Sequence, residues 1–211
     1  MERRNTTNPV KIETRGEGDD KKTAITGLGI TYYDESNPGT EFRLWGDTFE
    51  RIKPGAFDKA IAEDDVRGLF NHDPSQVLGR TKSGTMRLTA TDDGVVYEID
   101  ESDTSVFRDV AEHIRRGDVD GASFAFRVTD ERWFEDGDRE IREILAGELF
   151  DVGPVTYPAY SGTDAQVASR DSGHVDEART SYDLWKEQRQ HEQNQIESLE
   201  MRFRMTEMDI D

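Results

Sequence analysis

Three kinds of side chain that can carry out chemistry together lie in separate apolar segments of this sequence. His72 lies in "GLFNHDPSQVLGRTKSGTMRL", Ser123 lies in "GASFAF", and Glu148 and Asp151 lie in "ELFDVGPVTYPAY". Histidine titrates near neutrality without perturbation, and it can take the proton of a serine hydroxyl when a carboxylate orients its ring. Together these residue types are those that a hydroxyl nucleophile requires for acyl transfer.

Each of these residues also has an ordinary structural interpretation. His72 can be a polar residue that closes a turn, and Ser123 can be a core serine with a satisfied hydrogen bond. Residues 148 and 151 are three apart and face opposite sides of a strand, so at most one of them points at a shared site. The other histidines are weaker candidates because they lie in a helix or in the polar C-terminal third: His113, His174 and His191.

The composition limits the classes of protein to which the chain can belong. The chain has 211 residues, of which 33% are hydrophobic and 35% charged, and this favours one compact domain with polar tails. A net charge of -19 argues against binding to nucleic acid or to an anionic membrane. The absence of cysteine excludes disulfides and thiolate zinc sites. No apolar run approaches the ~20 residues of a membrane helix, so we expect a soluble intracellular protein.

The acidic turns do not predict a metal site. Neither "EDGDRE" nor the paired aspartates elsewhere have the ligand spacing of a calcium loop, and solvated turns explain them. We therefore expect neither a metal nor a cofactor.

The order of polar and apolar segments predicts four regions. Residues 1–22 read as a polar N-terminal arm, 23–163 as the folded domain, 164–180 as a small and polar linker, and 181–211 as a charged helical tail.

Within the folded domain the patterns predict about seven or eight strands and two helices. Residues 23–34 and 40–52 read as strands that can pair across the turn between them, and "GTMRLTATDDGVVYEIDE" reads as a hairpin. The best helix spans residues 103–116, with Asp103 or Thr104 as its N-cap and Gly117 as its stop. This order predicts a mainly β fold with peripheral helices (α+β), namely a single closed or nearly closed antiparallel β-barrel.

Five segments carry a resemblance to a known family. The succession "ERIKPGAF", "LFNHDPSQVLGRTKSGTMRL", "DDGVVYEID", "IRRGDVDGASFAFRV" and "FDVGPVTYPAYSGTDA" resembles the prohead proteases of tailed bacteriophages, which are distantly similar to herpesvirus assemblin. The resemblance runs from about Ile25 to Ala165. The family's "NHD" histidine falls on His72 and its "G-x-SF-x-F" serine falls on Ser123. The family often has "EVS" where this chain has "DVG", so the acidic position falls on Asp151, with Glu148 in reserve.

The resemblance implies a serine endopeptidase with a β-barrel ringed by helices. It would cut scaffold segments from the major capsid protein, and also itself, inside the immature capsid in the host cytoplasm. The linker at 164–180 would be a possible region of self-cleavage, and a homodimer is expected by analogy with assemblin. The alternative is a capsid assembly or scaffold protein that retains the protease fold without activity. The presence of both His72 and Ser123 favours the enzyme.

Overall fold

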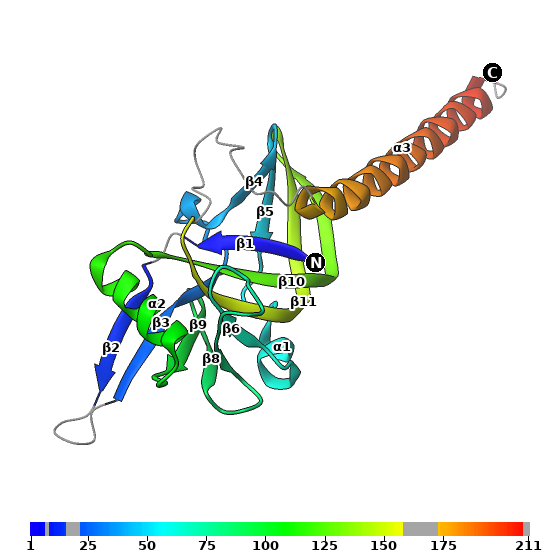
Figure 1. Cartoon of the computed structure of the whole chain (residues 1–211). Coiled ribbons are helices and arrows are strands. Elements are labelled where there is room, and N and C mark those ends of the chain that lie inside the picture. Colours follow the sequence, from blue (N-terminus) through cyan, green and yellow to red (C-terminus); the bar gives the residue numbers. More distant parts are fainter. Residues whose placement is uncertain (7–8, 16–21, 158–172, 209–211) are drawn as a thin grey trace. The chain divides into compact units, whose positions relative to one another are not determined.

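The computed structural model of the chain describes residues 1–6, 9–15, 22–157 and 173–208. The chain divides into two compact units, Met1–Ser169 and Arg170–Asp211. All strands of the described residues belong to the first unit, and the second contains the long helix α3 (Gly173–Met208). Figure 1 labels the elements, which follow in order: β1 (Glu2–Thr6), β2 (Lys11–Arg15), β3 (Lys22–Thr31), a 3-10 turn (Pro38–Thr40), β4 (Phe42–Trp45), β5 (Thr48–Ile52), α1 (Asp58–Glu63), β6 (Arg67–Leu69), β7 (Val77–Arg80), β8 (Met86–Thr91), β9 (Gly94–Asp100), α2 (Ser105–Arg116), β10 (Gly121–Asp136), β11 (Arg139–Val155) and α3.

The larger sheet has seven strands and is built around the long β10–β11 hairpin (Figure 1). Its strands follow the order β1-β10-β11-β5-β4, and β6 also pairs with β11 and with β7. The expected antiparallel arrangement holds between β10 and β11 but is wrong for the other two pairings of β11, which runs parallel to β5 and to β6. Parallel strands are joined by long connections, as β5 and β6 are to β11, and such connections leave no local pattern in the sequence. The turn residues in the sequence identify mainly short antiparallel hairpins.

The second sheet has four strands in the order β2-β3-β9-β8. The hairpin predicted for "GTMRLTATDDGVVYEIDE" is confirmed as β8 and β9. The predicted pairing of residues 23–34 with 40–52 is wrong, because β3 pairs with β2 and β9, and residues 40–52 fold into a hairpin of β4 and β5.

The mainly β class with some helices agrees with these elements, but the pairings do not close a barrel. In the described part of the chain the larger sheet has the edge strands β1, β4 and β7, and the smaller one ends at β2 and β8. A single closed barrel therefore stays a prediction.

A common core joins the two sheets and fixes the position of β10. Phe57, which precedes α1, packs edge-on against Phe124 and Phe126 of β10, with ring centroids 5.9 and 5.7 Å away. Phe124 and Phe126 stack on each other, and all three rings are fully buried. Since side chains alternate along a strand, this packing directs residues 123 and 125 to the opposite face of β10.

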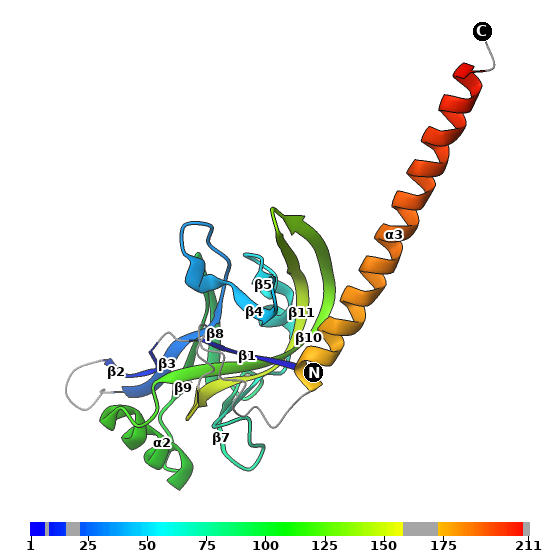
Figure 2. The ribbon, with the colours of Figure 1, turned by 90° about the horizontal axis from the view of Figure 1, so that it is seen from above.

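Helix α2 has the ends that its sequence predicts. Thr104 is the N-cap, since its Oγ1 accepts a hydrogen bond from the backbone N–H of Phe107 at 3.2 Å. Gly117 adopts a left-handed conformation with φ 78° and ends the helix. The buried side of α2 contacts β2 and β7, and Figure 2 shows the helix at the periphery of the strands.

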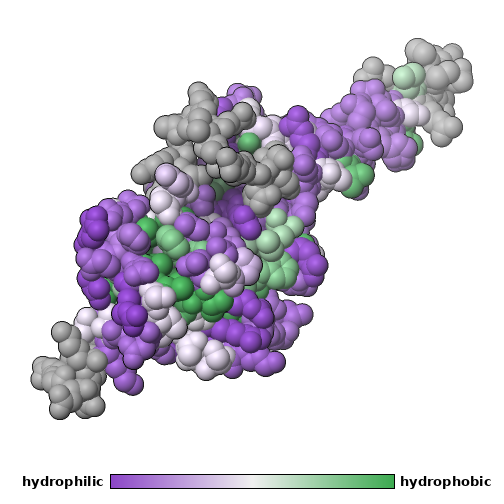
Figure 3. Space-filling view, in the orientation of Figure 1, coloured by the Kyte–Doolittle hydropathy of each residue, from purple (hydrophilic) through white to green (hydrophobic). Residues whose placement is uncertain are grey.

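The surface of the described residues is largely polar, in agreement with the composition. In Figure 3 hydrophilic residues dominate the visible face, and hydrophobic residues gather near its centre. None of the helices in the described part of the chain contains an apolar stretch long enough to cross a membrane.

The N-terminal residues differ from the polar arm that the sequence predicts. Strand β1 pairs with β10 along its length, and β2 pairs with β3. In β1 the residues that alternate into the interior are Glu2, Arg4 and Thr6, which are polar. The linker predicted at 164–180 lies outside the described residues as far as residue 172, and its remainder, from Gly173, forms the start of α3.

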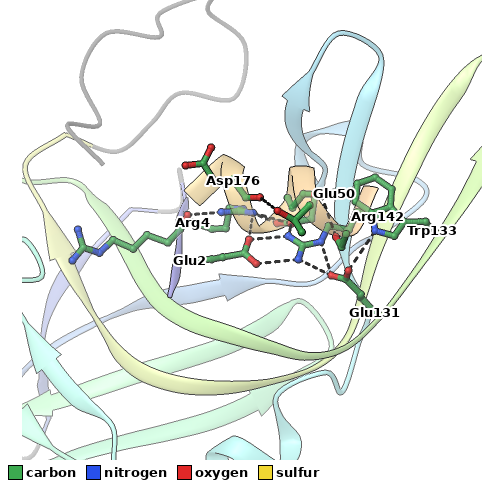
Figure 4. A network of polar contacts seen from close by, with 11 residues as sticks. Glu2, Arg4, Glu50, Glu131, Trp133, Arg142 and Asp176 are labelled. Atoms are coloured by element: carbon green, nitrogen blue, oxygen red, sulfur yellow. Dashed lines mark hydrogen bonds and ion pairs between the residues drawn. The ribbon is translucent and has the colours of Figure 1, made fainter. Parts of the chain in front are cut away.

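A buried charge cluster fastens β1 to the rest of the larger sheet (Figure 4). Arg4 donates two hydrogen bonds to the carboxylate of Glu50, at 2.6 and 2.8 Å, and one to Glu2 at 2.7 Å. Arg142 donates to Glu2, to Glu50 and, through Nε at 2.7 Å, to Glu131. The pKa of Glu50 is lowered, because the opposing effect of burial is outweighed by Arg4 and Arg142. Each buried charge in this cluster thus has a partner of opposite sign.

Glu50→Gln is expected to lower the free energy of unfolding by about 3 to 5 kcal/mol, because it leaves buried arginines without a full set of carboxylates. A carboxylate with a lowered folded pKa stabilises the protein above its unfolded pKa, and this contribution is lost as the pH falls through the folded value. The difference in the free energy of unfolding between wild type and Glu50→Gln should therefore be full at pH 7 and shrink below the ordinary pKa of 4.5. Urea unfolding at pH 7 and pH 4, followed by circular dichroism, measures both effects.

The matched control is Glu63→Gln, which removes an exposed carboxylate 3.9 Å from Lys59. Exposed ion pairs contribute ~1 kcal/mol or less. Equal losses in the two variants would show that the cluster does not hold the sheet together.

Candidate active site

Ser123 is placed by the packing of β10. Its neighbour Phe124 is locked in the core, so Ser123 points to the opposite face of the strand. The serine is fully buried, and it lies opposite Asn5 of β1 on one side and Gly153 of β11 on the other. A buried hydroxyl needs hydrogen-bond partners, and Ser123 has two.

His72 lies in the turn between β6 and β7, and its backbone is unusual. Asn71 and His72 have φ values of 54° and 56°, and they are the non-glycine residues with positive φ in the described part of the chain. The left-handed region costs an L-residue roughly 1 to 2 kcal/mol. Such a conformation persists when surrounding contacts determine it, and it is enriched at functional sites.

Asp151 lies on β11, beside a bulge. Asp151 is opposite Ala125 and Leu149 is opposite Phe126, so Phe150 is the extra residue of β11 at this register shift. Asp151 is two residues from Gly153, the cross-strand partner of Ser123, so it lies on the same face of the hairpin as Ser123. The bulge brings Glu148, opposite Arg127, onto this face as well, so the expectation that residues 148 and 151 face opposite sides is wrong. The carboxylate side chain is 8% exposed.

The imidazole of His72 bridges these two side chains. Its Nε2 lies 2.6 Å from Ser123 Oγ, and its Nδ1 lies 2.5 Å from Asp151 Oδ1. In the neutral tautomer that carries its proton on Nδ1, the ring donates to Asp151 and accepts the serine hydroxyl on Nε2. The three residues, called here the candidate triad, thus have the contacts that a general base and an orienting carboxylate require.

The hydroxyl of Ser123 has a second acceptor. Ser123 Oγ lies 3.0 Å from the carbonyl oxygen of Arg4 in β1. One hydroxyl proton cannot be given fully to both acceptors, so proton transfer to His72 requires the hydroxyl to turn from Arg4. Strand β1 therefore forms part of the surroundings of the candidate triad.

Gly153 lets the histidine turn approach the sheet. A Cβ atom at this position would lie 2.1 Å from the carbonyl oxygen of Leu69, which is far below any normal contact. Gly153 lies opposite Ser123, so the missing side chain leaves room for the β6 backbone on the face toward which Ser123 points. Gly153 is the glycine of "DVG", at the position where the family often has serine. In this chain a side chain at that position would collide with the backbone of β6.

Glu148 and Asp73 have other partners. Glu148, the reserve candidate, forms an exposed ion pair with Arg127 across the β10–β11 hairpin. Asp73 accepts hydrogen bonds from the backbone N–H and the hydroxyl of Ser75, which lower its pKa and close the turn.

The other histidines do not join this site. His113 lies 3.5 Å from Asp118 on the surface, and His191 contacts Gln195 within α3. The side chain of His174 lies outside the described residues. Among the described residues no group of three or more histidine and acidic side chains is arranged to hold a metal ion.

Sequence reasoning missed three contributors to the site. Asn71 was not singled out, although asparagine before a candidate histidine is a signal for a left-handed turn. The close contact of Gly153 with the β6 backbone gave no such signal, and neither did the hydrogen bond from Ser123 to the carbonyl of Arg4. Both depend on which strands become neighbours in the fold.

Comparisons with known proteins give the chain its family. No curated protein matches the sequence. Among solved structures the chain is similar to the bacteriophage T4 capsid assembly protease, with 14% sequence identity, a TM-score of 0.40, and coverage of 75% of this chain and 100% of that one. The family model of the caudovirus prohead serine proteases matches residues 10–178, a range that contains all three residues of the candidate triad. This chain belongs to the caudovirus prohead serine protease family.

Proposed function

We propose that this protein is a serine endopeptidase that cleaves scaffold segments from the major capsid protein during prohead maturation. The observation that supports it most is the imidazole of His72, which contacts both Ser123 Oγ and Asp151 in a member of this family. Capsid proteins are the substrates expected of a prohead protease, and the protein would act inside the immature capsid in the host cytoplasm.

The reaction proposed is acyl transfer. Ser123 Oγ attacks the peptide carbonyl carbon while His72 Nε2 takes the hydroxyl proton. The carbon–nitrogen bond then breaks, and the same proton goes to the leaving amine. Water, deprotonated by His72, hydrolyses the acyl-enzyme and restores the serine. Asp151 holds the ring in the required tautomer and stabilises the imidazolium.

The substrate is tested by co-expressing the chain with its cognate major capsid protein. We expect wild-type protein to convert the capsid protein to a discrete shorter product, and we expect His72→Ala to leave it at full length. Because the side chain of His72 is only 10% exposed, its removal can disturb packing, and circular dichroism should confirm that the variant folds. Full-length capsid protein beside the wild-type chain, with normal assembly, would favour the inactive assembly protein instead.

Self-cleavage belongs to the same proposal and has a separate readout. The region 164–180 is its proposed location, because it is small and polar in sequence. Intact mass measurement of the purified chain should show conversion of the 24.0 kDa species to a shorter one, while His72→Ala stays intact. A wild-type chain that keeps its full mass after long incubation would remove self-cleavage from the proposal.

A further inference from the structure

The turn that carries His72 is fastened to the end of β11 by the residue before it. Asn71 Oδ1 accepts a hydrogen bond from the backbone N–H of Thr156 at 2.8 Å, and Asn71 Nδ2 donates to Thr156 Oγ1 at 3.0 Å. The backbone N–H of Asn71 donates to the carbonyl of Pro154 at 3.1 Å. Three hydrogen bonds therefore join one residue of the turn to two residues of the strand end.

The opposite side of the turn is closed by local hydrogen bonds. Phe70 N–H donates to the carbonyl of Gln76 at 3.1 Å, and Asp73 N–H donates to the carbonyl of Phe70, also at 3.1 Å. These bonds shape the turn but do not tie it to β11. Besides the contact of His72 with Asp151, Asn71 supplies a side-chain link between the turn and Thr156, the residue that follows β11.

We propose that Asn71 is a positioning residue, whose side-chain amide clamps Thr156 and so holds His72 between Ser123 and Asp151. The inference rests on the proposed function, because it assigns the clamp to the general base of that reaction. Asp151 lies five positions before Thr156 in the sequence. The clamp therefore ties the base to the polypeptide segment that carries its orienting carboxylate.

The left-handed backbone of two successive residues supports this role. Asparagine tolerates positive φ better than most residues, but His72 must adopt it as well. Strain of this kind relaxes unless neighbouring contacts oppose it. Without the clamp the turn can relax, and a shift of about 1 Å in a catalytic group lowers rates by about 100-fold.

The test separates the clamp from the backbone conformation. Asn71→Gly removes both side-chain hydrogen bonds and leaves positive φ without strain, since glycine adopts it freely. We expect purified Asn71→Gly to react about 10- to 100-fold more slowly than wild type with a small fluorophosphonate, which labels an activated serine. On the cognate capsid protein kcat should fall by a similar factor while KM stays within about twofold. If asparagine serves only to tolerate positive φ, Asn71→Gly would keep the wild-type rate, and the proposal would be overturned.

Thr156 gives a second, independent variant. Thr156→Val removes one of the two side-chain hydrogen bonds and should slow labelling less than Asn71→Gly does. Thr156→Ser keeps the hydroxyl and should label at the wild-type rate. On the Asn71→Gly background Thr156→Val should have little further effect, because the clamp is already broken. Fully additive losses would contradict a shared clamp.

The matched control is Asn37→Gly. Asn37 also caps a turn through its side chain, by accepting from Gly39 N–H at 3.1 Å, but it contacts no residue of the candidate triad. Its labelling rate should equal that of wild type, and its urea midpoint shows what the loss of one asparagine does to stability.

A wild-type chain that neither labels nor cleaves refutes the proposed function, whereas an active wild type with an equally active Asn71→Gly refutes the clamp alone.

Discussion

Ser123→Ala is expected to slow peptide hydrolysis by about 10⁶-fold, the size of loss measured when the nucleophile of a serine protease is removed. The variant keeps the contact between His72 and Asp151 but has no oxygen to form the acyl-enzyme. Initial rates of cleavage of the cognate capsid protein, measured with purified wild-type and variant proteins, test this. Fluorophosphonate labelling should vanish at the same time.

Ser75→Ala is the matched control for Ser123→Ala. Ser75 lies in the same turn as His72, but its hydroxyl donates to Asp73 and to no residue of the candidate triad. Its removal should change the cleavage rate by less than about threefold, since an exposed side-chain hydrogen bond contributes ~1 kcal/mol or less. Cleavage that survives Ser123→Ala would place the nucleophile elsewhere in the chain.

Asp151→Asn is expected to lower kcat by about 10⁴-fold, as the corresponding change does in a serine protease triad. An asparagine amide that donates to Nδ1 forces the imidazole proton onto Nε2. In that tautomer Nε2 cannot accept the proton of Ser123, although the ring keeps its position. Single-turnover rates at neutral pH should show the loss.

Glu148→Gln distinguishes the two carboxylates that the sequence leaves open. Glu148 is paired with Arg127 in solvent, so its neutralisation should change kcat by less than about threefold. If Glu148→Gln lowered kcat more than Asp151→Asn, the roles assigned to these two residues would have to be exchanged.

The candidate residues His72 and Ser123 are recognisable in the sequence because each sits in a local motif. The choice between Glu148 and Asp151 is not, since it depends on where the histidine turn meets β11: His72 contacts Asp151, whereas Glu148 pairs with Arg127. The contact with His72 joins residues 79 positions apart, and the apolar pattern of one strand does not reveal it. The ends of α2 were predictable for the opposite reason, because Thr104 and Gly117 act on their own helix.

The N-terminal strand was missed because its buried residues are charged. Hydrophobic alternation identifies strands whose interior side chains are apolar, but Glu2 and Arg4 are buried through ion pairs with Glu50 and Arg142. Their partners lie 46 to 140 positions away in the sequence. No pattern within residues 1–22 contains that information, and a polar arm was the natural expectation.

Under the proposed function, the long sequence separations around β1 also determine when a newly made chain becomes able to cut peptides. The Arg4 carbonyl meets Ser123 across 119 positions, and His72 meets Asp151 across 79. At about 5 to 20 residues per second, a ribosome needs roughly 7 to 30 s to pass from β1 to the end of β11. A nascent chain lacks Asp151 throughout that interval, so translation itself delays assembly of the candidate triad until nearly the whole first unit has been made.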